Sequence, residues 1–510
     1  MLVPFAKPCT SGRLLLKNTA LNFLAQFLPL VVGLFAIPKL IGALGVERFG
    51  ILTLAWAIIG YSSLFDLGLG RALTKVVAER IHCTEQGELG QLIWTGLLMM
   101  LMAGALGAAV MIGASSWLIH SVLKVSPQLQ SETIKAFQYL ALSIPIVILT
   151  TGLRGVLEAN QLFALVTAVR LPLGILTFAA PWLLLVFSHS LVIIVIGLFL
   201  IRWLACIAQF LCVLWKYPVL LHGFRVRISI ARLLLGFGGW MTVTNVISPI
   251  MSNLDRFLVG AIVSVAAVAY YTTPYEMITK LWLIPFALAG VLFPAFSSLA
   301  ENPARLTYLL DRGVNYVMLL LFLPTLFIAA FARIGMRLWL GASFAANSAL
   351  ILQLLCLGVF INSISQIPFA LIQGIGRPDL TAKLHFAELP LYLGLAYLLI
   401  REYGVQGAAV AWLTRAILDG IALCLIATRV LPSSTKPVQR ASYRVVVALG
   451  FCLVALVLNG WFRTIFVAAV ACAFVKVAWS SVLGEGERKV FTSRFKTATM
   501  ADRAHVSASS

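Results

Sequence analysis

The chain has 510 residues, of which 61% are apolar and 11% are charged, and its formal net charge is +20. A soluble globular protein carries about a quarter charged residues, so this composition excludes a soluble enzyme, a disordered chain and a secreted disulfide scaffold. It predicts an all-α polytopic membrane protein, because a helix needs about 20 apolar residues to cross the bilayer core.

Apolar segments of this length follow one another along the whole chain. The first contains Asn22, Gln26 and Pro29 and has no Ala-x-Ala-like cleavage site at its end, so we interpret it as a retained helix and not as a signal peptide. We expect about 14 membrane-spanning helices, within a range of about 12 to 14. They are predicted at 18–40, 50–70, 91–119, 134–153, 166–188, 191–215, 234–262, 270–298, 314–335, 347–373, 384–400, 405–428, 443–461 and 464–483.

Lysine and arginine residues between these segments predict the orientation of the chain. With the N-terminus placed in the cytoplasm, 25 basic residues fall in cytoplasmic segments, eight in outer segments and five within spans. Because basic residues gather on the cytoplasmic side, both termini are expected in the cytoplasm of a cell with this protein in its inner (plasma) membrane. The charge is spread over many short segments, so it indicates topology and not nucleic-acid binding.

Motifs for metal, redox or nucleotide chemistry are missing from the sequence. The eight cysteines and six histidines are scattered, and no C-x-x-C, H-E-x-x-H or G-x-x-x-x-G-K-[ST] motif occurs. We therefore expect no metal site, no cofactor and no ATP-binding cassette on this chain.

Two stretches of the sequence resemble each other at an offset of about 219 residues. Aligning Gly155 with Gly374 brings Pro172 opposite Pro390 after one gap. Such an offset spans six helices, so the two halves would share one topology as parallel repeats. We therefore expect two six-helix bundles that open a central cavity to alternate sides of the membrane, followed by two added helices.

This organisation divides the chain into six parts. They are a cytoplasmic N-terminus (1–17), an N-terminal six-helix bundle (18–215), a cytoplasmic linker (216–233), a C-terminal six-helix bundle (234–430), two extra helices (443–483) and a cytoplasmic tail expected to be disordered (484–510).

Ionisable residues within the spans are the candidates for a functional site. A charge at the bilayer centre costs at least about 2.5 kcal/mol and needs a partner or a wet cavity. Asp66 lies near the end of the second span, five residues before Arg71. Asp255 and Arg256 are adjacent, so their side chains point about 100° apart on a helix and neutralise each other poorly. At least one of these two side chains should face the cavity.

Two further pairs have i,i+4 spacing, which places both side chains on one helix face. Glu276 and Lys280 follow Tyr275 in the eighth span, and Arg415 and Asp419 lie in the twelfth. Both pairs can be simple intrahelical ion pairs, and we favour that interpretation for the second. Cations in a cavity suit an anionic solute, and buried carboxylates suit coupling to protons or sodium. Aromatic rings either stack on sugars or anchor helices at the membrane interface.

Several stretches also carry a family resemblance, in the order in which they occur. They are NTALNFLAQFLPLVVGLFAIPKLIGALGVERFGILTLAWAI, FDLGLGRALTK, GLRGVLEANQLF, NLDRFLVG and AYYTTPYEMITKLWLIPFALAGVLFPAFSSL. Together they resemble the Wzx-type polysaccharide-biosynthesis flippases of the MOP superfamily, whose MATE-like fold has two six-helix bundles. The resemblance covers roughly residues 12–430.

The resemblance implies a flippase that moves polyprenyl-diphosphate-linked oligosaccharide repeat units, of the O-antigen or exopolysaccharide type, across the inner membrane. It implies ion-coupled alternating access and no enzymatic activity. The implied partners are the lipid-linked substrate, membrane lipids, H⁺ or Na⁺, and the polysaccharide polymerase and glycosyltransferases, with no nucleic acid. By analogy the substrate-binding residues would be Arg154, Arg256, Lys280 and Tyr275, and the ion-coupling or structural residues would be Asp66, Asp255 and Glu276.

Three alternatives stay open. A multidrug or cation exporter of the same superfamily should have cavity carboxylates without cations, and Arg256 and Lys280 argue against it. A lipid II flippase also has fourteen helices in its own family, but the order of the motifs is nearer the oligosaccharide group. A membrane scaffold without transport activity would have no reason to keep charges within its spans.

Overall fold

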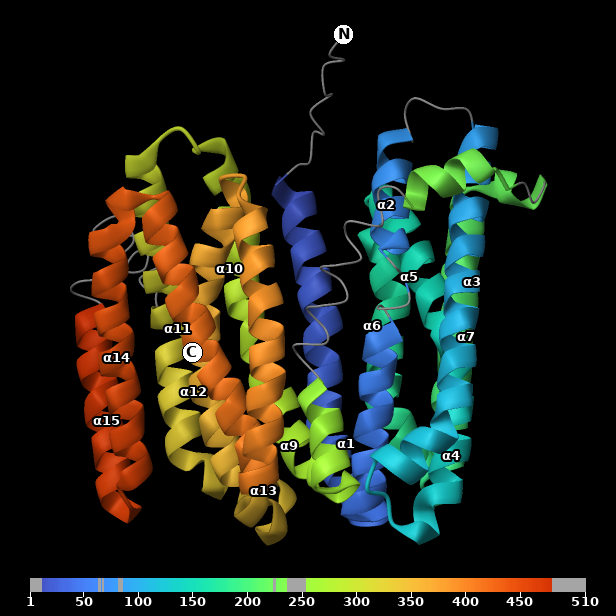
Figure 1. Cartoon of the computed structure of the whole chain (residues 1–510). Helices are drawn as coiled ribbons and strands as arrows, with labels where there is room; N and C mark the ends of the chain where they lie inside the picture. The colour runs from blue at the N-terminus through green and yellow to red at the C-terminus, as the bar shows by residue number, and fades with distance from the viewer. Residues whose placement is uncertain are drawn as a thin grey trace, which may run out of the picture. The chain divides into compact units, whose positions relative to one another are not determined.

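The computed structural model describes residues 12–62, 66, 68–80, 86–222, 226–235 and 254–478. Every regular element in these ranges is a helix, which confirms the all-α class (Figure 1). Within the described residues, eleven segments are long and apolar enough to cross a membrane. Two of these segments, in α1 (Gly12–Tyr61) and α13 (Pro378–Val430), are each divided by a glycine with non-helical backbone angles, and counting both parts gives a number in rough agreement with the prediction. The seventh predicted span lies mostly outside the described residues, and the predicted tail lies wholly outside them.

The chain forms two compact units, of which the first contains Met1–Thr273 and Leu389–Ala408. Its apolar core joins α2 (Leu69–Arg80), α3 (Gln86–Trp117), α5 (Ser143–Ala159) and α7 (Leu191–Lys216). It includes Leu73, Leu92, Leu153 and Val213, which are almost fully buried. The helices of this unit are α1 (Gly12–Tyr61), α2 (Leu69–Arg80), α3 (Gln86–Trp117), the π-helical turn η2 (Leu118–Val122), α4 (Pro127–Ala141), α5 (Ser143–Ala159), α6 (Phe163–Leu184), α7 (Leu191–Lys216), η3 (Pro218–His222), short helices over 228–235 and 254–262, the start of α9 (Val265–Ile278) and the middle of α13 (Pro378–Val430).

Helix breaks recur at corresponding places in the two halves of the sequence, as the predicted repeat requires. Gly45 divides α1 with φ of 77°, a left-handed conformation that glycine adopts without steric cost. The position that corresponds to Gly45 at an offset of about 219 residues is Ser264. The helix over 254–262 ends just before it. A second break separates α5 from α6 at Asn160, and its counterpart separates α12 (Ala342–Gly374) from α13 (Pro378–Val430) at Gly376.

The second unit contains Pro274–Glu388 and Ala409–Ser510. Within it, α14 and α15 lie side by side (red in Figure 1), so the two added helices of the prediction are present. The guanidinium of Arg463 on α15 donates to the Ala330 carbonyl of α11 at 2.9 Å. The helices are the rest of α9, the 3₁₀ turn η4 (Thr279–Trp282), α10 (Leu283–Ser298), α11 (Pro303–Leu340), α12 (Ala342–Gly374), the two ends of α13 (Pro378–Val430), η5 (Pro432–Ser434), α14 (Thr435–Val457) and α15 (Gly460–Val477).

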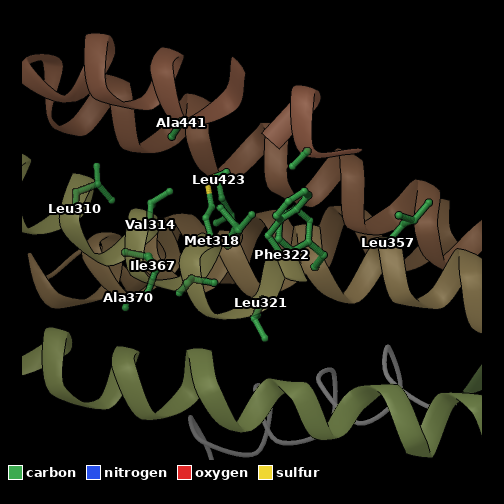
Figure 2. Close-up of a cluster of buried hydrophobic side chains, with 14 of the residues drawn as sticks. Leu310, Val314, Met318, Leu321, Phe322, Leu357, Ile367, Ala370, Leu423 and Ala441 are labelled. Carbon is green, nitrogen blue, oxygen red and sulfur yellow. The ribbon is translucent and has the colours of Figure 1, made fainter. Parts of the chain in front are cut away.

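The core of the second unit follows from the spacing of apolar residues on α11. Leu310, Val314, Leu321 and Met318 recur at three- and four-residue intervals and are buried, which is the pattern of one helix face. Figure 2 shows this face packed against the neighbouring helices of the unit. The labelled partners are Leu357, Ile367 and Ala370 of α12, Leu423 of α13 and Ala441 of α14.

Candidate functional site

Asp66 caps the start of α2 in the first unit. Its Oδ1 accepts a hydrogen bond from the backbone N–H of Gly70 at 2.9 Å, and its Oδ2 lies 3.2 Å from the same nitrogen. An acidic cap satisfies a backbone donor that the first helical turn leaves free and interacts favourably with the helix dipole. A Cβ at position 70 would lie 2.9 Å from Oδ2, so the cap depends on glycine at this position. The carboxylate is buried, with 6% of the residue exposed.

Two arginines, on α2 and α5, act on this cap, and a third on α6 joins them through Arg154 and Glu158. Arg71 and Arg154 both act electrostatically on the Asp66 carboxylate. Arg170 interacts electrostatically with Arg154 and with Glu158, and the Arg154 Nε atom lies 3.5 Å from a Glu158 carboxylate oxygen. The cluster therefore has three positive and two negative groups, which leaves it with a net positive charge. It draws together residues that are far apart in the sequence.

Close packing of α5 on its neighbours places Arg154 in this cluster. A Cβ at Gly155 would lie 2.1 Å from the Thr74 hydroxyl oxygen on α2, and one at Gly152 would lie 2.6 Å from the sulfur of Met100 on α3. Small residues let membrane helices approach closely. The two glycines that flank Arg154 in the sequence GLRG therefore allow α5 to lie against both helices.

Asp255 occupies a buried hydrogen-bonded position in the first unit. Its carboxylate accepts hydrogen bonds from the hydroxyl of Tyr271 on α9 and from that of Tyr392 on α13, the latter at 3.4 Å. The backbone N–H of Arg256 donates to the other carboxylate oxygen at 2.9 Å. Asp255 is fully buried and Arg256 is 3% exposed. Tyr392 is a partner that the sequence did not predict, because no local spacing links it to Asp255.

Glu276 and Lys280 form the intrahelical ion pair that their spacing predicts. The Lys280 ammonium lies 3.2 Å from the Glu276 carboxylate, and both side chains are 44% exposed. Tyr275, the preceding residue, is buried against two tryptophan rings. It makes edge-to-face contacts with Trp282 and Trp412 at centroid distances of 6.5 and 6.0 Å. Of the three rings of Tyr275, Trp282 and Trp412, that of Trp282 is only partly buried, so a ligand could contact it.

Arg415 and Asp419 are not an isolated pair. His385 and Glu388, on the other arm of α13, join them, and one side-chain atom each of His385, Glu388 and Asp419 lie within 4.8 Å of one another. One histidine and two carboxylates resemble a metal ligand set. The Arg415 charge acts on both carboxyls and opposes a divalent cation, so the residues present do not fit one. The sequence did not group these residues, because their contact crosses the break in α13.

Comparison with known proteins adds a family and a fold to this geometry. The model of the polysaccharide biosynthesis protein family matches residues 43–349. A candidate O-antigen transporter of Shigella flexneri is 32% identical over 419 residues, which are 81% of this chain and 98% of that protein. An inward-facing MATE-family multidrug transporter of the MOP superfamily matches with a TM-score of 0.65 at 14% identity, over 79% of this chain and 95% of that one. The lipid II flippase MurJ matches with a TM-score of 0.64 at 13% identity, over 89% and 98%.

Proposed function

Because the chain belongs to the polysaccharide biosynthesis protein family, we propose that it is a flippase for polyprenyl-diphosphate-linked oligosaccharide repeat units of the O-antigen or exopolysaccharide type. The substrate is picked up at the cytoplasmic leaflet of the inner membrane and released at the outer leaflet. Both termini are cytoplasmic in this proposal, because the segments on the same side of the membrane as the termini contain most of the basic residues. The reaction moves a lipid and breaks no bond, so the protein acts as a transporter and not as an enzyme.

The arginine cluster of the first unit carries this proposal. A diphosphate is a compact multivalent anion, and guanidinium groups bind phosphate oxygens through paired, charge-assisted hydrogen bonds. The Arg154 side chain is 39% exposed, and among the described residues Glu158 is the one carboxylate at ion-pair distance from it. Its guanidinium therefore has donors to offer to a headgroup, with Arg71 and Arg170 adding to the positive potential.

The remaining site residues take secondary roles in the proposal. Lys280 is exposed enough to meet an anionic headgroup while it stays paired with Glu276. The aromatic group around Tyr275 offers the Trp282 face to a sugar ring. The buried Arg256 adds positive charge, and Asp66 and Asp255 hold their surroundings in place through the hydrogen bonds described above.

The fold alone does not choose the substrate, because both a multidrug transporter and a lipid II flippase share it. The choice rests on the O-antigen transporter relative, which this chain covers almost completely. A drug exporter for organic cations would place negative charge at its site, whereas the cluster around Arg154 is net positive.

A deletion of the gene in its host tests the proposal. The deletion strain should lose its polymerised surface glycan on gels and accumulate the polyprenyl-diphosphate-linked repeat unit, and the intact gene should reverse both changes. A deletion strain with normal glycan and increased sensitivity to cationic dyes would overturn the proposal in favour of the drug exporter.

A further inference from the structure

A second group of ionisable residues lies in the second unit, apart from the arginine cluster. His385 and Glu388 lie on the first arm of α13, three residues apart, and Arg415 and Asp419 lie on the second arm, four residues apart. Each pair shares a helix face, and the two faces meet. His385 Nε2 lies 3.8 Å from Asp419 Oδ1.

The contact between the arms depends on the break in α13. Gly404 has φ of 58° and ψ of −138°, a conformation open to glycine and strained for other residues. It separates one long helical segment into two arms and allows the second to return beside the first. Residues that are about 30 positions apart thereby share one site, as the His385–Asp419 distance shows.

The charges of the group do not balance. Two carboxylates and one guanidinium leave one negative charge in excess when His385 is neutral. Asp419 is 3% exposed. Its Oδ1 atom and both oxygens of Glu388 have no N–H or O–H donor among the described residues, and the two carboxyl groups lie close enough for one to donate to the other once it is protonated. An excess charge in a membrane-spanning segment is unfavourable, and two carboxylates at this separation do not both stay ionised readily.

We propose that the Glu388–Asp419 pair binds one proton, and that this is the proton which drives the transporter. The coupling role of this proton rests on the proposed flippase function. Uptake of one proton turns one carboxylate into a carboxylic acid that donates to the other, and the group becomes neutral. Arg415 balances the carboxylate that stays ionised. Release of the proton restores the excess negative charge and weakens the packing between the two arms of α13.

A proton fits this group better than a metal ion does. Sodium prefers a shell of several oxygen ligands, and an imidazole nitrogen is a poor ligand for such a hard cation. A divalent cation would lie beside the positive charge of Arg415. A proton needs only the two carboxyl groups, which polarise each other as a shared acid–carboxylate pair does.

Residues of α13 and of α12 surround the Glu388–Asp419 pair. Among the described residues, the charged or titratable groups that lie near Asp419 and Glu388 include His385 and Arg415, which act on the pair, and Cys424, on which Asp419 acts; all three belong to α13. From α12, the ring of Phe369 stacks on His385 at a centroid distance of 5.6 Å. A Cβ at Gly420 would lie 2.8 Å from the Ser365 hydroxyl oxygen, so α12 lies directly against this part of α13.

Infrared difference spectroscopy of the purified full-length protein tests proton binding directly. A protonated carboxyl group has a C=O stretching band that a carboxylate lacks. We expect such a band to grow as pH falls in the wild-type protein and to be lost in both Glu388→Gln and Asp419→Asn. The control is Asp379→Asn on the same helix, whose carboxylate is 44% exposed and paired with Arg377; it should keep the band. A band that persists unchanged in both test variants would overturn the site.

Two further measurements keep the assignment testable if one variant folds poorly. Arg415→Gln removes the balancing cation, so the band should grow to about twice its size near neutral pH; a smaller band would contradict the proposal. Exchange of choline chloride for sodium chloride at constant pH should leave the wild-type band unchanged. Loss of the band on adding sodium would assign the site to that ion and overturn the proton.

The coupling role has its own test in the host. Asp419→Asn and Glu388→Gln should abolish surface glycan in the deletion strain, whereas Asp379→Asn should restore it. Normal glycan in both test variants would overturn coupling at this site. The spectra need no glycan substrate, so a failed proton assignment leaves the proposed flippase function standing, and a failed flippase function leaves the proton measurement standing.

Discussion

The Gly155 backbone on α5 approaches the Thr74 hydroxyl on α2 so closely that a Cβ on Gly155 would lie 2.1 Å from that oxygen. The same hydroxyl donates to the carbonyl of Gly70 at 2.8 Å, and the Gly70 N–H donates to Asp66. Asp66 in turn lies within the electrostatic reach of Arg154. The contact between two helices and the position of the arginine cluster thus depend on one set of small residues.

Replacement of Gly155 by alanine should therefore destabilise the protein. The added methyl overpacks a tight contact, at a cost of about 1–3 kcal/mol. Thr74→Ala in the same chain removes the clashing oxygen and should recover most of the loss, which makes the pair a double-mutant cycle. Thermal unfolding in detergent measures the effect, with Gly42→Ala as the control, because no atom lies within 4 Å of a Cβ there. Equal loss in the single and double variants would refute a direct Gly155–Thr74 contact.

Replacement of Arg154 by alanine should reduce glycan export without unfolding the protein. A charge-assisted hydrogen bond contributes about 1.5–3 kcal/mol, so export should fall by about tenfold or more, and Arg154→Lys should recover only part of it. The rate of appearance of surface glycan in the deletion strain provides the measurement. Arg305→Ala is the matched control, because Arg305 is exposed and lies in the second unit. If Arg154→Ala exports glycan at the control rate, the cluster does not bind the headgroup.

Lys280→Glu should impair export more than Lys280→Ala does. Both side chains of the Glu276–Lys280 pair are 44% exposed, and an exposed i,i+4 pair contributes only about 0.3–0.5 kcal/mol, so alanine should leave the melting temperature nearly unchanged. Glutamate at position 280 places a second negative charge beside Glu276 and repels a diphosphate. Surface glycan and melting temperature should be measured together for both variants. Identical export in the two variants would mean that Lys280 only pairs with Glu276.

Local spacing in the sequence predicts some parts of the site and misses others, for a physical reason. The i,i+4 rule found the Glu276–Lys280 pair, which forms as expected, because both residues lie within one helical turn. The same rule predicts the Arg415–Asp419 pair but not the contact between Asp419 and His385, because the break at Gly404 brings these two residues together. Composition likewise predicted the all-α class, because the bilayer permits few alternatives.

The periodicity of the sequence also does not predict which way an aromatic side chain points. The family resemblance implies substrate binding by Tyr275, and an aromatic residue at this place could equally anchor a helix; in the structure its ring is buried against Trp282 and Trp412. Whether an aromatic residue on an apolar helix faces a partner or a cavity depends on neighbours that are distant in the sequence. Trp412 is such a neighbour. Its ring fits beside Gly358 because glycine has no Cβ, which would lie only 2.5 Å from the ring.

The hydrogen bonds to Asp255 predict a stability effect with a built-in rescue. Tyr271→Phe removes one hydroxyl donor from a fully buried carboxylate and should cost about 1–3 kcal/mol. Tyr392→Phe should cost less, since its hydroxyl lies 3.4 Å from the carboxylate oxygen. Asp255→Asn in the Tyr271→Phe background replaces the charge with a neutral amide and should restore part of the stability. Thermal unfolding provides the measurement, with Tyr403→Phe as the control because Tyr403 is 66% exposed. A Tyr271→Phe protein as stable as the control would show that the carboxylate does not need this donor.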